Sequence, residues 1–92
     1  MTCRIDRLSI ERGVALRISG RLTADHLEVV RVELEDGGVV ALDLTEVELV
    51  DRDAVKLLVL TEASGIELRH CPTYIREWIT RERESSEGRA HR

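Results

Sequence analysis

The stretch VVALDL, residues 39–44, most constrains what this chain can fold into. Five of its six residues are apolar, and a nearly continuous apolar run is typical of a β-strand that is covered on both faces. The flanking segments 23–36 and 52–63 carry apolar residues at helical spacing, and each ends at glycine, Gly37-Gly38 and Gly65. A strand between two such helices predicts parallel strands joined by right-handed helical crossovers.

The N-terminal part predicts an antiparallel hairpin. Residues 3–12 are rich in Ile and Leu, and residues 14–19 alternate between apolar and polar side chains. The Arg12-Gly13 corner between them has the character of a turn. Thr23 is expected to cap the helix that follows.

The C-terminal part adds one strand and one helix. Residues 66–70 read as a short strand, and Pro72 suits the beginning of a last helix. The expected buried stripe of that helix is Ile75, Trp78, Ile79 and Tyr74. The predicted fold class is therefore α/β: a small mixed β-sheet, an antiparallel hairpin plus parallel strands, packed with helices in the order β-β-α-β-α-β-α.

A chain of 92 residues suffices for one small domain. We assign this domain to residues 1–82. Half of residues 83–92 are charged and only Ala90 is available for burial, so we predict a mobile charged tail there.

Charge and composition argue against several classes of function. The net charge is −4, the acidic and basic residues are interspersed, and Tyr74 and Trp78 are the only aromatic residues. A nucleic-acid-binding protein would need a basic stripe or stacking aromatic side chains. The sequence has neither an apolar run of the ~20 residues that span a bilayer nor an apolar signal segment near its start. We therefore expect a cytoplasmic protein without nucleic-acid partners or membrane insertion.

The charged junction Asp51-Arg52-Asp53 stands between the apolar strand and the second helix. Asp51 is a good N-cap, and Asp53 lies in the first turn, where the helix dipole favours a carboxylate. A capped helix with a solvated Arg52 would explain both acids without any function. The helical spacing also places Arg52, Asp53, Lys56 and Leu60 together, away from the face that meets the sheet. An apolar centre ringed by charge suits a protein-binding surface.

The stretch LDLTEVELVDRDAVKLLVL resembles the signature of STAS domains, the fold of bacterial anti-sigma-factor antagonists. Members of that family show an apolar strand, a loop, and Asp-Ser-Ser-Gly at the beginning of an apolar helix. The similarity extends over about residues 8 to 80, although the last strand and helix of the family are missing or replaced. It implies a STAS-like fold and a switch without enzymatic activity, in which a kinase that is also the anti-sigma factor phosphorylates the second Ser.

This sequence departs from the family at the switch. By position, Asp51 matches the Asp of the motif, Arg52 its first Ser, Asp53 the phosphoacceptor and Ala54 the Gly. Asp53 thus carries one permanent charge where phosphorylation would add about −1.5 to −2. The resemblance then implies either a chain fixed in a state like the phosphorylated one, or a constitutive adaptor in bacterial signalling or transcription regulation. We favour the adaptor, because a merely disabled surface would not explain Arg52.

Three alternatives stay open. Relatives of this kind also serve as accessory subunits of transport ATPase complexes, so the partner is an anti-sigma kinase or an ATPase subunit. The loops after residues 39–44 and 66–70 emerge at one sheet edge, which would gather Asp51, Asp53, His70 and Cys71; a small enzyme using Cys71 as a nucleophile is the second alternative. Tyr74 and Trp78 are a turn apart, which suggests a weak homodimer. Neither a cofactor nor a metal is indicated, because the histidines and cysteines lack ligand spacing.

Overall fold

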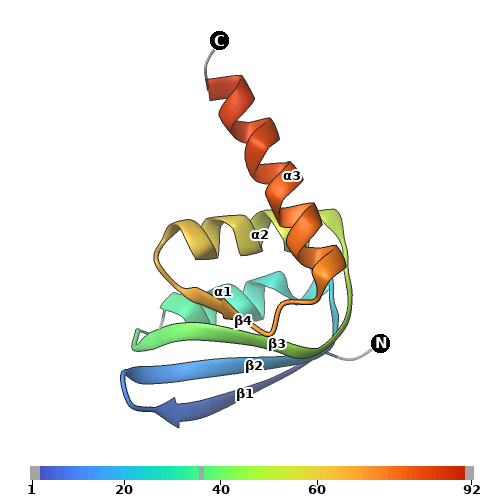
Figure 1. The fold of residues 1–92 in the computed structure, drawn as a ribbon. Coiled ribbons are helices and arrows are strands. Elements are labelled where there is room, and N and C mark those ends of the chain that lie inside the picture. The colour runs from blue at the N-terminus through green and yellow to red at the C-terminus, as the bar shows by residue number, and fades with distance from the viewer. Residues whose placement is uncertain (1–2, 36, 91–92) are drawn as a thin grey trace.

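The computed structural model describes residues 3–35 and 37–90, with the backbone alone for residues 86–90. Four strands, three α-helices and a single 3-10 turn, η1, follow one another along the chain (Figure 1). Their bounds are β1 (Cys3–Ile10), β2 (Gly13–Leu22), η1 (Ala24–His26), α1 (Leu27–Glu35), β3 (Val39–Val50), α2 (Arg52–Ala63), β4 (Glu67–Arg69) and α3 (Thr73–Ala90). The predicted small mixed α/β fold is confirmed.

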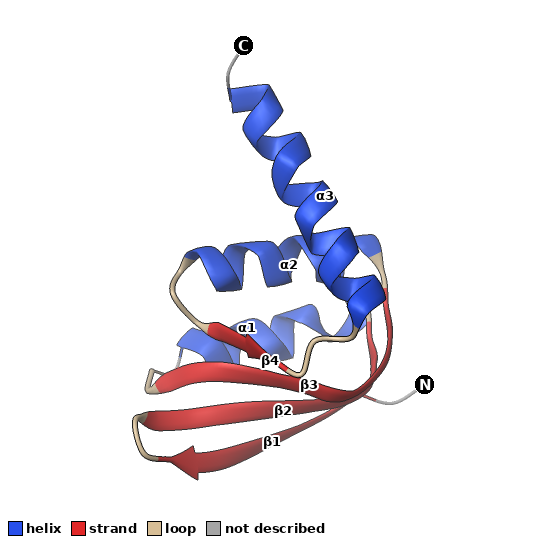
Figure 2. Cartoon of the chain, viewed as in Figure 1, coloured by secondary structure: helices blue, strands red, loops and turns tan. Residues whose placement is uncertain are grey.

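The four strands form one sheet in the order β1-β2-β3-β4 (Figure 2). β1 and β2 pair antiparallel, as a hairpin must, whereas β2 with β3 and β3 with β4 pair parallel. The connection from β2 to β3 and the connection from β3 to β4 each lead to the next strand of the sheet, in the same direction across it. Right-handed crossovers that run in the same direction place their helices on the same face of a sheet. One face of the sheet is therefore the helix face.

The core lies between the helix face and the three helices. It is aliphatic, as the near absence of aromatic residues requires. The sheet contributes Leu16, Ile18, Leu42 and Leu44, and the helices contribute Val30, Val55, Leu58, Ile75 and Ile79, all fully buried. Trp78 packs partly buried against this core, whereas Tyr74 is exposed and donates its hydroxyl to the Glu48 carbonyl at 3.2 Å. The predicted stripe of α3 thus holds for Ile75, Ile79 and Trp78 but not for Tyr74.

The prediction that strand 39–44 is covered on both faces was wrong. β3 continues to Val50, and helices cover only the face that carries Leu42 and Leu44. Ala41 points to the opposite face and is nonetheless buried, because it is small enough for neighbouring side chains to close over it. The apolar Ala41 made the sequence look like a strand covered by helices on both faces, although the face that carries Ala41 has no helices.

The first helix begins differently from the prediction. Thr23 occupies the N-cap position, but its side chain makes no capping hydrogen bond, and a 3-10 turn precedes the α-helix. The amide of Ala24 instead donates to Oδ2 of Asp51 at 2.8 Å. A residue 27 positions further along the chain replaces the local cap. The predicted last residue of this helix, Asp36, lies outside the described residues.

The tail predicted from residue 83 is helical in the structure as far as Ala90, while residues 91–92 lie outside the described part. The reason is a contact between helices. Glu62 on α2 accepts two hydrogen bonds from Arg76, both of 3.0 Å, and one from Arg83. Arg83 therefore attaches the second half of α3 to α2, although its surroundings in the sequence are polar.

The Glu62 carboxylate also yields a prediction on pH. Hydrogen bonds from Arg76, together with the charges of Arg76 and Arg83, lower the pKa of Glu62 against the opposing effect of burial. Because the pKa is lower in the folded state, the stabilisation is present above the usual value of about 4.3 and is lost as the pH falls through the lowered pKa. We expect Glu62→Gln to cost about 1 kcal/mol at pH 7 and much less at pH 3, measured by urea unfolding.

Glu67→Gln is the matched control for this measurement. Glu67 accepts from Arg69 at 3.2 Å, but it is exposed, and isolated exposed pairs contribute little. A cost of Glu62→Gln that is the same at both pH values would contradict the role assigned to the carboxylate.

Candidate functional site

Asp51 is the fixed point of the charged junction. Its Oδ1 accepts from the amide of Ala54 at 2.9 Å, which confirms the predicted N-cap of α2. Its Oδ2 accepts from the amide of Ala24 at 2.8 Å and so holds the beginning of η1. One carboxylate thereby accepts from one amide in the first turn of each of two helical segments, where free N–H groups would otherwise need water or other partners. The end of β3, the beginning of α2 and the end of β2 are thus joined at a single side chain.

The next residues point away from this junction. Arg52, Asp53 and Lys56 are exposed, and Leu60 is 65% exposed, the most exposed of the large apolar side chains on the described surface. The buried residues of α2 are Ala54, Val55, Leu58 and Thr61. We call the exposed set Arg52, Asp53, Lys56 and Leu60 the α2 patch. The helical spacing that predicted it is confirmed as far as exposure is concerned.

A groove between α1 and α2 adjoins the α2 patch. It has a volume of about 290 Å³, and its walls include Leu34, Leu57, Leu60 and Ile66. Leu60 therefore belongs both to the patch and to the groove. Two further apolar residues of α1, Val29 and Val32, are also more than half exposed. The sequence analysis did not predict that Val29 and Val32 are exposed. The signal was available, because both residues fall outside the helical spacing of Leu27, Val30 and Leu34.

Among the described residues, no hydrogen bond or ion pair joins Asp51 or Asp53 to His70 or Cys71, the residues of the alternative catalytic site. Arg69 of β4 pairs in register with Asp43, so His70 follows beside Asp43, eight residues before Asp51. The favourable charge interaction of His70 is accordingly with Asp43. Past His70 the chain continues toward the end of β3, since the hydroxyl of Tyr74 donates to the carbonyl of Glu48, three residues before Asp51, at 3.2 Å. The described part of the chain thus shows no hydrogen-bonded group of catalytic residues among Asp51, Asp53, His70 and Cys71.

The environment of Cys71 opposes the thiolate. Burial raises the pKa of the Cys71 thiol, the charge of Arg76 partly offsets that effect, and Glu62 adds to it. A nucleophilic cysteine needs the opposite shift. The surroundings of this thiol therefore favour its protonated, unreactive form.

Other kinds of site find little basis in the described residues. Within residues 3–35 and 37–90, no three His, Cys, Asp or Glu side chains come together as a metal site would require. No helix in the same ranges combines the length and apolar character that crossing a membrane demands. His91 lies outside the described part.

Comparison of the chain with family models gave no match, and comparisons with curated proteins and with solved structures gave none either.

Proposed function

We propose that this chain is a non-enzymatic protein-interaction module, STAS-like in character, that binds a protein partner through the α2 patch. One observation carries the proposal: Asp51 is hydrogen-bonded to two helical segments, while its neighbours Arg52 and Asp53 are exposed. A loop held in this way presents its charged side chains from a fixed backbone. Binding then costs little ordering of the chain, which favours affinity.

The chemistry of the patch suits a protein partner. Leu60 supplies an apolar contact at one end of the patch, and Arg52, Asp53 and Lys56 supply charged contacts along the helix before it, a mixture of apolar and polar contacts that is usual in protein interfaces. Arg52 presents five N–H donors and suits a bidentate contact with a carboxylate of the partner. The adjoining groove extends the apolar area toward α1.

The position of Asp53 supports a constitutive adaptor. Asp53 stands at the phosphoacceptor-equivalent position of the resembled motif, and a carboxylate there keeps one negative charge without a kinase. Binding would then depend on the amounts of the two proteins. A role in bacterial signalling or transcription regulation follows from the resemblance.

The proposal predicts that partner capture depends on the α2 patch. We expect protein with an intact α2 patch, carrying a photo-crosslinking residue in place of the exposed neighbour Ala63, to capture a defined partner from native lysate. The same bait with Arg52→Ala/Asp53→Ala should capture at least tenfold less, because both charged contacts are lost. Its free energy of unfolding should change by no more than about 1 kcal/mol, since Arg52 is a surface residue and Asp53 adds only a dipole contact.

The matched control is Glu77→Ala/Arg81→Ala, which also removes one acid and one base from exposed positions of a helix. Undiminished capture by the Arg52/Asp53 variant would refute the proposal. A partner identified as an anti-sigma kinase or as a transport ATPase subunit would decide between the two pathways.

A further inference from the structure

The face of the sheet opposite the helices takes no part in the proposed function. Its side chains alternate along each strand with those that enter the core. Arg7 lies on the helix side, where its guanidinium pairs with Glu33 of α1 at 2.6 Å, so Asp6 and Leu8 point to the other side. We call this other side the open face.

Four charged residues cross the open face in one row, one from each strand. The strand registers pair Asp6 with Arg17, Arg17 with Asp43, and Asp43 with Arg69. The signs alternate from β1 to β4: acid, base, acid, base. Arg17 and Asp43 are also in direct contact, with Nε and Oδ2 3.8 Å apart.

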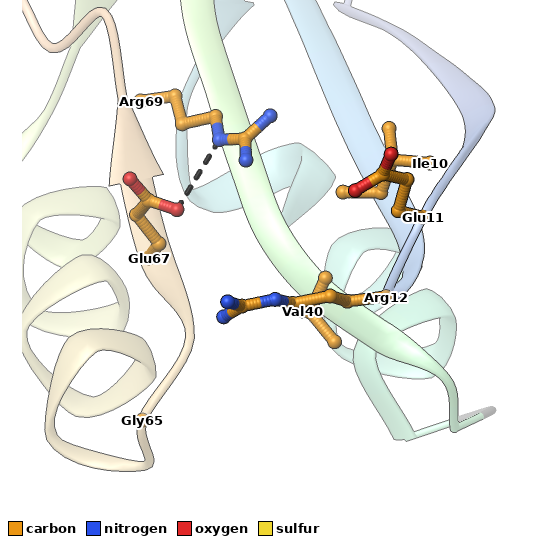
Figure 3. A pocket seen from close by; sticks show the side chains of 7 residues that line it. All are labelled: Ile10, Glu11, Arg12, Val40, Gly65, Glu67 and Arg69. Atoms are coloured by element: carbon orange, nitrogen blue, oxygen red, sulfur yellow. Dashed lines mark hydrogen bonds and ion pairs between the residues drawn. The ribbon is translucent and has the colours of Figure 1, made fainter.

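Asp6, Asp43 and Arg69 each have polar partners within their own copy. Burial alone would raise the pKa of Asp43, but hydrogen bonds from the hydroxyl and amide of Thr45 prevail and lower it. At the two ends, Arg4 lies 3.3 Å from Asp6, and Glu67 lies 3.2 Å from Arg69 (Figure 3). At neutral pH the row therefore presents charges of alternating sign.

The order of the charges makes the row complementary to itself. Read backwards, acid-base-acid-base becomes base-acid-base-acid. A second copy, turned about a twofold axis that runs parallel to the strands and over the middle of the open face, between β2 and β3, would place Asp6 opposite Arg69 and Arg17 opposite Asp43. In the adjacent row of Leu8, Ala15, Ala41 and Glu67, Ala15 would come opposite Ala41, and both are already covered by the side chains beside them. Aligned packing of two sheets is a common geometry.

We infer that the open face binds a second copy of this chain, as an aligned sandwich of two sheets held by the row Asp6, Arg17, Asp43 and Arg69. The association is weak for two reasons. Four strands at about 4.8 Å give a narrow face, well below the ~800 Å² per partner of standard interfaces. A hollow of about 490 Å³, whose walls include Arg12, Glu67 and Arg69, also reduces the area of close contact beside Arg69 (Figure 3).

The test uses charge reversals at the two ends of the row. In the dimer, residue 6 of each copy faces residue 69 of the other copy. With Asp6→Arg both of these facing pairs carry two positive charges, and with Arg69→Asp both carry two negative charges. We expect each variant alone to raise the dissociation constant of the dimer at least tenfold in sedimentation velocity at low salt, because like charges in an interface oppose association. An equimolar mixture of the two variants pairs opposite charges again at both ends and should restore wild-type affinity as a heterodimer.

The mixture separates a dimer contact from an effect inside one chain. Within a single copy, β1 and β4 are three strand spacings apart, about 14 Å, so Asp6 and Arg69 do not pair directly. Tyr74→Ala is the control for the other exposed candidate surface and should leave the dimer unchanged. A monomeric wild type at millimolar concentration, a dimer indifferent to the reversals, or a mixture that fails to associate would each overturn the inference.

Discussion

Replacement of Asp51 by alanine is expected to lower the free energy of unfolding by about 2 kcal/mol. A single N-cap typically contributes about 1 kcal/mol, and the Asp51 carboxylate accepts from the amides of both Ala24 and Ala54. Both amides would lose their partner in the variant. Urea unfolding measures the energy, and hydrogen exchange should show faster exchange at the beginning of both helical segments.

Asp53→Ala is the matched control, because it removes a carboxylate from the same helix beginning without touching either cap. Its cost should stay within about 0.3–1 kcal/mol, the range of a charge interacting with the helix dipole. If Asp51→Ala and Asp53→Ala lowered the free energy of unfolding equally, the two hydrogen bonds of Asp51 would contribute no more than the dipole contact of Asp53. Exchange that increases at Ala54 alone would mean that the contact with Ala24 contributes little.

Gly13→Ala is expected to destabilise the fold by about 2–3 kcal/mol. Gly13 has a φ of +151°, and an added Cβ would lie only 2.5 Å from the Gly38 carbonyl oxygen. That oxygen also accepts from the amide of Val14 at 2.8 Å, so the backbone cannot move without loss of this bond. The strain at a conformation of this kind is of the order of 1–3 kcal/mol, before the clash is added.

Gly37→Ala separates the two causes. Gly37 also has a positive φ, +89°, but nothing lies within 4 Å of the position of an added Cβ. Thermal or urea unfolding of the two variants should show a loss of about 1 kcal/mol for Gly37→Ala and at least twice that for Gly13→Ala. If Gly13→Ala is the milder change, the close approach of the two backbones in the structure is wrong.

The features that depend on residues close together in the sequence could be predicted. The cap at Asp51 and the bounds of α2 follow from local rules, and the exposure of the α2 patch follows from helical spacing alone. The class of the fold follows because an apolar strand between two amphipathic helices has few other solutions.

The features that depend on contacts between residues far apart in the sequence could not be predicted. Thr23 looks like a cap, but the carboxylate that does the capping comes from Asp51. Residues 83–90 look irregular because the stabilising partner of Arg83 is Glu62 on another helix. The α1 side of the groove has the same cause, because it exists only once α1 and α2 lie side by side. Nothing in the composition of VVALDL reveals that one side of the strand has no helices.

The course of α3 has a mechanical consequence. The helix has 18 residues, packs at its base through Ile75 and Ile79, and extends beyond the rest of the molecule (Figure 1). From Ile75 to Ala90 an α-helix covers about 22 Å, so a tilt of about 10° at the base would displace the far end by about 4 Å. Glu62, through Arg76 and Arg83, resists that tilt. A shift of α2 at Glu62 would therefore be transmitted to α3 through Arg76 and Arg83, and the displacement would be larger at the far end of the helix.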